Sequence, residues 1–422
     1  MKILYVSQYF SPEMGAPAAR VHELSRHWVN AGHEATVLTG FPNHPTGKID
    51  PEYRGKLWRG IFRERTEGIS VVRSWLLPFP NRRTFGRILN YTSFAVSAGL
   101  AGLAICRPDV IIASSPQLLV GLSGYWLSLR QRAPLVFEVR DLWPESLTAV
   151  GAGGRTSLLY RSLTRTASFL YQNADHVVVV SPAFEPRLVE DWHVPREKIS
   201  IIENGVETGI FAPQSAGQLR RSLCLEGKFV VSYIGTFGMA QGLETVAAAA
   251  IELQQTNPEV FFLLVGEGAE KQRLLDFVQR QKIANIQILG EQPRASIPDF
   301  IAASDACLVP LKKRTIFRTV IPSKMLEFMS CARPVILGVE GEAHTILEQS
   351  RGGISIEPED PQALANAVRF LSANPRFCRE MGERGRQFVV RNFSRKNTAE
   401  RYIRVLEEVL QSTRQERGAV AA

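Results

Sequence analysis

Cysteine is scarce in this sequence, and its placement excludes two kinds of stabilised fold. The 422 residues contain five cysteines, none of them in a C-x-x-C pair: Cys106, Cys224, Cys307, Cys331 and Cys378. An odd and scattered set argues against a disulfide framework and against structural zinc. We therefore expect a protein of a reducing compartment, the cytoplasm.

Long apolar runs are also missing. After Lys2 only a handful of apolar residues precede polar and turn residues, which is too short for the apolar core of a signal peptide. An uncharged run at residues 88–106 approaches membrane-spanning length, but Asn90, Ser93 and Gly99 are among the residues that interrupt it. This run predicts a buried or interfacial helix rather than a membrane span.

Acidic residues are outnumbered, and the excess of basic residues predicts an anionic partner. The chain has 50 lysines and arginines against 41 acidic residues, a formal net charge of +9. Two local clusters stand out: Arg54, Lys56, Arg59, Arg63 and Arg65, and Arg82, Arg83 and Arg87. No nucleic-acid motif or interleaved aromatic platform accompanies them, so nucleic acid is not the expected partner. We expect an anionic membrane surface, which places the protein peripherally on the inner face of the plasma membrane; a solvated basic face is the alternative.

What the sequence does contain is a double series of short apolar runs alternating with helical patterns. The first series starts at residue 2 and the second restarts at residue 228. This alternation predicts an α/β protein with two facing Rossmann-like, doubly wound domains and a cleft between them. The predicted boundaries are a first domain at 1–208, a linker at 209–226, a second domain at 227–392, and a terminal helix and tail at 393–422 that pack back on the first domain.

Glycines follow several of the predicted strands. In parallel sheets ligands bind beyond the carboxyl ends of the strands. Gly15 follows the first strand, Gly235 and Gly238 follow the first strand of the second series, and Gly266 follows the next. One glycine alone indicates a turn, but their shared position indicates loops that approach a ligand closely and cradle a diphosphate.

The stretch "IPSKMLEFMSCARPVI" at 321–336 places two charges at the start of a helix. Pro322 and Ser323 predict that this helix begins near Ser323. Lys324 and Glu327 then share an edge of the first turn, where free backbone N–H groups attract anions. A solvated ion pair on an amphipathic helix is the alternative.

Taken together, these segments resemble glycosyltransferase family 4, whose members have the two-domain arrangement called GT-B. The resemblance covers nearly the whole chain and is carried by "KILYVSQYFSPEMGAPAARVHELSRHWVNAGHEATVLTG", "ENGVETGIFAP", "YIGTFGMAQGLETV", "FLLVGEG", "ASDACLVPL", "PSKMLEFMSCARPVI" and "GERGRQFVVRNFS". The segments "FPNHPTG" and "RDLWPES" are similar to those of a bacterial subgroup that builds surface polysaccharides and transfers N-acetylated amino or deoxy sugars.

In the second domain, the resemblance implies a nucleotide-sugar site. Glu327 would accept hydrogen bonds from the ribose hydroxyls and Lys324 would face the diphosphate. The family's second glutamate is replaced by Thr319, and its usual basic pair by nearby Thr236 and Gln241. Arg314 and Arg318 are further candidates to neutralise the diphosphate. The predicted donor-binding residues are Gly15, Gly235, Thr236, Gln241, Gly266, Lys324 and Glu327.

In the first domain, the resemblance implies an acceptor site. Arg140 and Asp141 stand where many relatives have a His-Asp pair, and Asp141 would contact the acceptor hydroxyl or sugar; a helix N-cap is the alternative for this residue. His44 and Arg20 are the other acceptor-site candidates. The predicted catalytic residues are Asp141, Arg140 and Lys324.

The implied activity is that of a retaining glycosyltransferase. The donor would be a nucleotide-diphosphate sugar, UDP-linked, and the acceptor a lipid-linked sugar or oligosaccharide, in O-antigen, capsule or other cell-surface polysaccharide synthesis. The sequence has no D-x-D, which agrees with a mechanism without metal or cofactor. A nucleotide-sugar epimerase of the same architecture and a catalytically idle binding partner are the alternatives.

Overall fold

The structure, a computed structural model, describes residues 1–13, 15–44, 46–80, 84–143 and 157–421. The chain divides into two compact units. The first contains Met1–Asn204 together with Arg395–Ala422, and the second contains Gly205–Ser394. Residues 209–226, for which a linker was predicted, lie within the second unit, where Phe211 and Leu225 are buried.

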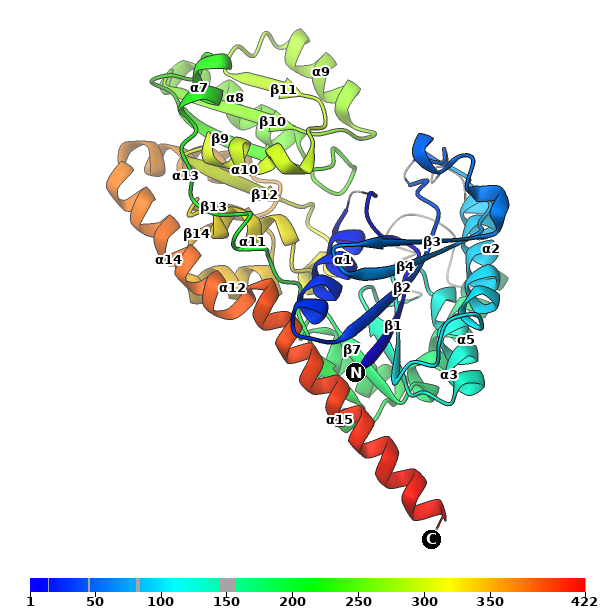
Figure 1. Ribbon diagram of the computed structural model, residues 1–422. Coiled ribbons are helices and arrows are strands. Elements are labelled where there is room, and N and C mark those ends of the chain that lie inside the picture. The colour runs from blue at the N-terminus through cyan, green and yellow to red at the C-terminus, as the bar shows by residue number, and fades with distance from the viewer. Residues whose placement is uncertain (14, 45, 81–83, 144–156, 422) are drawn as a thin grey trace. The chain divides into compact units, whose positions relative to one another are not determined.

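The first unit is built on a largely parallel sheet whose strands run in the order β3-β4-β2-β1-β5-β6-β7-β8 (Figure 1). The strands are β1 (Lys2–Val6), β2 (Glu34–Gly40), β3 (Ile61–Thr66), β4 (Ile69–Ser74), β5 (Val110–Ser114), β6 (Leu135–Val139), β7 (His176–Val179) and β8 (Ile199–Ile201). The helices are α1 (Ala16–Asn30), α2 (Thr84–Gly102), α3 (Leu119–Gln131), α5 (Leu158–Asn173), α6 (Phe184–Trp192) and α15 (Arg395–Ala421).

Alternating residues of the first strand show how both faces of this sheet are covered. Ile3 and Tyr5 pack in one core cluster with residues of α1 and α15. Leu4 and Val6 pack in another cluster with residues of α2, α3 and α5. A strand buried on both faces reads as a continuous apolar run, which is why the sequence predicted it.

The second unit has a parallel sheet in the order β11-β10-β9-β12-β13-β14. Its strands are β9 (Phe229–Ile234), β10 (Val260–Val265), β11 (Ile286–Leu289), β12 (Ala306–Pro310), β13 (Val335–Gly338) and β14 (Gly353–Ser355). Its helices are α7 (Gly217–Ser222), α8 (Glu244–Thr256), α9 (Lys271–Arg280), α10 (Ile297–Ala302), α11 (Ser323–Ser330), α12 (Glu342–Ser350), α13 (Pro361–Ala373) and α14 (Pro375–Phe393).

These two sheets confirm the prediction of two α/β domains. The structure adds β3, which pairs antiparallel with β4 at the edge of the first sheet. Arg63 and Arg65, predicted only as part of a basic cluster, lie on this strand. Charged residues on an exposed edge discourage pairing with a second chain.

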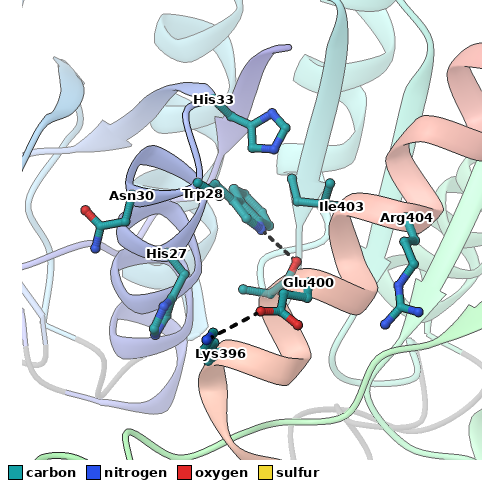
Figure 2. Close-up of a pocket in the computed structure, with 10 residues that line it drawn as sticks. His27, Trp28, Asn30, His33, Lys396, Glu400, Ile403 and Arg404 are labelled. Atoms are coloured by element: carbon teal, nitrogen blue, oxygen red, sulfur yellow. Dashed lines mark hydrogen bonds and ion pairs between the residues drawn. The ribbon is translucent and has the colours of Figure 1, made fainter.

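The carboxyl-terminal helix α15 belongs to the first unit and packs against α1. The indole N–H of Trp28 on α1 donates to the carbonyl of Ala399 on α15 at 3.1 Å. A recess of about 570 Å³ lies beside this bond, lined by His27, Trp28, Asn30, Ala31, His33, Lys396, Ala399, Glu400, Ile403 and Arg404. Figure 2 shows this region in close-up. None of the sequence-predicted site residues lines it.

Candidate functional site

Two loops at the carboxyl end of the second sheet pack closely enough to exclude side chains. Gly235 follows β9 with φ 147°, and Gly266 follows β10 with φ 153°. A Cβ on Gly266 would lie 1.9 Å from the Gly235 carbonyl oxygen. The Phe237 N–H donates to the Glu267 carbonyl at 2.8 Å, which joins the two loops. The predicted glycines thus form one continuous backbone surface.

Lys324, in the first turn of α11, reaches this surface. Its Nζ donates to the Tyr233 hydroxyl at 3.0 Å and lies 4.1 Å from the centre of the Tyr233 ring. A Cβ on Gly235 would come within 2.4 Å of the same Nζ, so the glycine makes room for the lysine. The Tyr233 hydroxyl in turn donates to the Thr236 carbonyl at 2.6 Å. The structure therefore brings together Lys324, Gly235 and Thr236, three of the predicted donor-binding residues.

The surroundings of Lys324 alter its basicity. Burial lowers the pKa of its ammonium group to about 8, although the nearby Glu327 carboxylate opposes this shift. Because its pKa is close to neutral pH, this half-buried lysine gains or loses its proton readily, and an anion bound nearby would stabilise its charged form.

Glu327 lies on the same helix and pairs with Arg294, a residue that the sequence did not predict. Their Oε1 and Nη2 atoms are 2.9 Å apart, and the Glu327 side chain is 13% exposed. Arg294 follows β11, and its guanidinium lies 5.1 Å from the ring centre of Phe211. Arg294 belongs to no recognisable sequence motif. Its position after a strand of the second sheet could have marked it as a candidate site residue, because ligands bind beyond the carboxyl ends of parallel strands.

Gln241, Arg318 and Arg314, together with Thr319 at the position of the family's second glutamate, lie in neighbouring loops of the second unit. Gln241 Oε1 accepts the Gly238 N–H at 3.1 Å and closes the loop after β9. Arg318 lies 3.6 Å from Glu340, and the Thr319 hydroxyl donates to the Ile316 carbonyl at 3.0 Å. Arg314 is exposed on the same loop after β12.

In the first unit, Arg20 is part of the core, and this corrects the prediction that it contacts an acceptor. Its side chain is fully buried and its Nε donates to Glu138 at 2.9 Å. Its other nitrogens donate to the carbonyls of Ile202 and Glu203 and to the Asn204 side chain. With these donors engaged, Arg20 joins α1 to β6 and to the segment after β8.

The same buried Glu138 connects Arg20 to Arg140. Burial opposes ionisation of Glu138, yet the Arg20 and Arg140 guanidinium groups hold its pKa below the ordinary value. The Arg140 N–H donates to Ser115 Oγ at 2.7 Å, and within the described part of the chain its buried Nη1 has no hydrogen-bond partner. Asp141 is exposed beside it. The alternative of a helix N-cap at Asp141 concerns residues 144–156, outside the described residues.

His44 lies in a loop that is held by Glu13. One carboxylate oxygen of Glu13 accepts the backbone N–H groups of Asn43 and His44, both at 2.9 Å. Burial raises the pKa of Glu13 to about 7 in spite of these bonds. The His44 ring packs edge-on against Tyr9 at 5.1 Å, and burial lowers its pKa. Gly15, with φ 133°, precedes the first turn of α1.

The predicted residues thus form two groups, one in each unit. Lys324, Gly235, Thr236, Gly266 and Glu327 belong to the second unit, whereas Arg140, Asp141 and His44 belong to the first. Over the residues that the structure describes, no group of three or more His, Cys, Asp or Glu side chains is arranged to hold a metal ion. The second-unit group combines a cation, side-chain-free backbone and a carboxylate, which suits a ligand with phosphate and hydroxyl groups.

Comparison with known proteins gives matches over both halves of the chain. Residues 15–205 match the family model of the glycosyl transferase 4-like domain, and residues 217–388 match that of glycosyl transferases group 1. WcaI from Escherichia coli (strain K12), provisionally assigned as a colanic acid biosynthesis glycosyl transferase, is 28% identical over 413 residues. The match covers 93% of this chain and 98% of WcaI.

Solved structures show the same fold. Sucrose-phosphate synthase from Thermosynechococcus elongatus superposes with a TM-score of 0.75 at 22% identity, over 97% of this chain and 99% of that one. HepE from Anabaena, in complex with UDP-glucose, superposes with a TM-score of 0.71 at 19% identity, over 98% and 100% of the two chains. These likenesses confirm the predicted GT-B fold.

Proposed function

Since the chain belongs to glycosyltransferase family 4, we propose that it transfers a sugar from a UDP-linked donor to a lipid-linked or saccharide acceptor, with retention. The sugar would be an N-acetylated amino or deoxy sugar, and the product part of a cell-surface polysaccharide such as O-antigen or capsule. The assignment of WcaI to colanic acid biosynthesis and the UDP-glucose complex of HepE support this proposal.

The observation that carries the proposal is the arrangement around Lys324. Its ammonium group lies against Gly235, where the backbone lacks side chains, and Glu327 lies on the same helix. A nucleoside diphosphate offers matching groups, because its phosphates seek cations and free N–H groups and its ribose offers two adjacent hydroxyl donors. The first turn of α11 adds N–H groups and a partial positive charge.

In this proposal, these groups stabilise the departing nucleoside diphosphate as the sugar bond breaks. Negative charge grows on the leaving phosphate, and a positioned lysine and helix terminus interact with it more strongly in the transition state than in the ground state. Lys324 would act on this charge and Arg294 would hold Glu327 in place. Asp141, Arg140 and His44 would meet the acceptor. No metal is needed for these roles.

We also propose a peripheral position on the cytoplasmic face of the plasma membrane. The described cysteines are free, which suits a reducing compartment, and among the described residues no helix has the length and apolar character needed to cross a bilayer. The predicted basic cluster at Arg82 and Arg83 lies outside the described residues, whereas Arg87 is on α2.

A donor screen followed by a turnover assay tests this function. We expect UDP and one UDP-sugar to raise the melting temperature of the protein, and that sugar to be transferred only when an acceptor is added. Consumption of the UDP-sugar without any acceptor would favour the epimerase. Stabilisation by the UDP-sugar with no turnover on a panel of lipid-linked and saccharide acceptors would favour the binding partner. No stabilisation by any nucleotide would contradict the proposal.

A further inference from the structure

The outer face of α2 and α3 carries apolar side chains where a soluble helix normally carries charged ones. Phe94, Ala98 and Ala101 of α2 are buried, but Val96 and Leu100 on its other side are 60% and 63% exposed. Leu122 and Leu129 of α3 are also exposed. An amphipathic surface helix places polar residues outward, so an outward apolar face indicates a partner.

This face is hollowed into an apolar groove between the two helices, which lie side by side in Figure 1. Its volume is about 360 Å³, and it is lined by Thr92, Ala95, Val96, Gly99, Leu100, Leu119, Leu122, Ser123 and Trp126. Gly99 lies beside Trp126 in this lining, and a Cβ at its position would lie at an ordinary contact distance of 3.5 Å from the Trp126 ring. The side chains that line the groove are almost all apolar, which suits a hydrocarbon chain.

A small polar recess of about 10 Å³ adjoins the groove on α2. It is lined by Tyr9, Asn43, His44, Phe79, Arg87, Asn90 and Tyr91. Tyr91 of the recess and Ala95 of the groove are one helical turn apart. Arg87 and Leu100 are separated by roughly 20 Å along the axis of α2, since an α-helix rises about 1.5 Å per residue.

Arg87 gives this recess its charge. Its Nε is buried and, among the described residues, has no hydrogen-bond partner. The Asn90 amide donates to Asn43 Oδ1 at 3.2 Å, and the Gln117 amide donates to the Tyr91 carbonyl at 2.8 Å. These bonds tie the recess to the loop of His44 on one side and to the start of α3 on the other.

The charge around the groove favours an anionic amphiphile. Between residues 68 and 137 the sequence has a single carboxylate, Asp109, which accepts the Lys2 N–H at 2.6 Å. Arginines border the far end of the groove: Arg130 lies 5.7 Å from the Trp126 ring centre, and Arg63 donates to the Ala104 carbonyl at 2.7 Å. Apart from Glu13, whose carboxylate accepts the backbone N–H groups of Asn43 and His44, this surface carries arginines at its rim, which complement phosphate groups attached to an apolar chain.

We propose that the α2–α3 groove binds the hydrocarbon chain of a lipid-linked acceptor, and that Arg87, on the same helix one turn before Tyr91, pairs with its phosphate. The proposal rests on the proposed function, because it assigns the apolar part of that acceptor to one surface. A chain bound here would place the polar head at the Arg87 end of the groove.

Direct binding of two simple phosphates tests the groove without relying on turnover. Dodecyl phosphate, kept below its micelle concentration, and methyl phosphate are titrated into the full-length protein by calorimetry. We expect dodecyl phosphate to bind at least tenfold more tightly, since burying about two methylenes gives this factor. Val96→Glu, which places a charge in the groove, should remove most of this difference while leaving methyl phosphate unaffected.

Val390→Glu is the matched control, because Val390 is 38% exposed on α14 of the second unit. It should bind both phosphates as the unchanged protein does. Equal affinity for the two phosphates, or an unchanged preference in Val96→Glu, would overturn the proposal. The proposal would also fail if Val96→Glu lost binding to anionic vesicles but still bound dodecyl phosphate more tightly than methyl phosphate. The outer face of α2 and α3 would then contact the bilayer without binding a single hydrocarbon chain.

The same variants separate this proposal from the proposed function. If dodecyl phosphate binds as expected but no sugar is transferred to any acceptor, the groove stands and the transferase assignment fails. If transfer occurs, Val96→Glu should raise KM for a long-chain acceptor at least tenfold and leave KM for a short-chain analogue with the same sugar unchanged. Equal KM values for the long-chain acceptor in Val96→Glu and Val390→Glu would refute the groove.

Discussion

Replacement of Lys324 by methionine separates a charge that acts on the leaving group from a surface ion pair. Methionine keeps most of the apolar stem of Lys324 and deletes the ammonium group that lies over the Tyr233 ring. Tyr233 still donates to the Thr236 carbonyl. Because burial disfavours the charged lysine, the variant should be at least as stable as the unchanged protein at pH 7.

The expected loss lies in the chemical step. Removing one preorganised donor from a developing anion costs about 2–4 kcal/mol, equivalent to roughly 30- to 900-fold in kcat. KM should change much less, because the charge on the leaving phosphate is greatest in the transition state.

The pH profile adds a second readout. The pKa of Lys324 is lowered to about 8, so kcat/KM should fall as pH rises through 8 and the ammonium group loses its proton. In Lys324→Met, kcat/KM should not fall as pH rises through 8. The free energy of unfolding should change with pH in the opposite direction to kcat/KM. Burying the charged Lys324 ammonium group destabilises the folded protein below pH 8, and this cost disappears as pH rises toward the pKa of the lysine in the unfolded chain.

The assay is steady-state turnover with the donor found by the nucleotide screen. Lys228→Met is the control, since Lys228 precedes β9 at the strand end opposite Gly235 and its Nζ donates to the Pro258 carbonyl. Near-normal turnover of Lys324→Met with an unchanged pH profile would refute the reasoning and direct attention to Arg294, Arg314 and Arg318.

Two further predictions concern the first unit. In Glu13→Gln the side-chain amide oxygen can still accept the backbone N–H groups of Asn43 and His44. In the unchanged protein, the pKa of Glu13 is raised to about 7 by burial, so the free energy of unfolding falls as pH rises from 4.5 to about 7. Denaturant unfolding should therefore show the variant gaining stability relative to the unchanged protein at pH 8 but not at pH 5; the same difference at both pH values would contradict this. Arg20→Met leaves Glu138 buried without its main cation and should cost about 3–5 kcal/mol of unfolding free energy. The exposed pair of Arg26 with Glu67 is the comparison, for which Arg26→Met should cost at most about 1 kcal/mol; similar losses in the two variants would contradict the role given to Arg20.

The strands and the glycine-containing loops at their ends could be predicted because their signals are local. Apolar runs buried on both sheet faces and glycines at strand ends are visible in short windows of sequence. Strand β3 was missed because its charged residues alternate on an edge, as in Arg63 and Arg65, and do not form an apolar run.

The contacts of individual side chains could not be predicted because they join distant positions. Arg20 was predicted at the acceptor site, but its partner in the core, Glu138, lies 118 positions away in the sequence. Glu13 binds N–H groups 30 and 31 positions away, and Arg294 reaches Glu327 from another strand end. Such pairings depend on the tertiary structure that brings distant loops together, and this cannot be inferred from a short segment of sequence.

The ribose contact of Glu327 tests the donor site most directly. Calorimetric titration of UDP into Glu327→Ala should show the loss of a charge-assisted acceptor, about 1.5–3 kcal/mol per bond, equivalent to roughly a 13- to 160-fold rise in Kd. Glu348→Ala, at an exposed position on α12, should bind UDP as the unchanged protein does. A Glu327→Ala variant with the same fold and unchanged affinity for UDP would contradict the account of how this chain holds its donor.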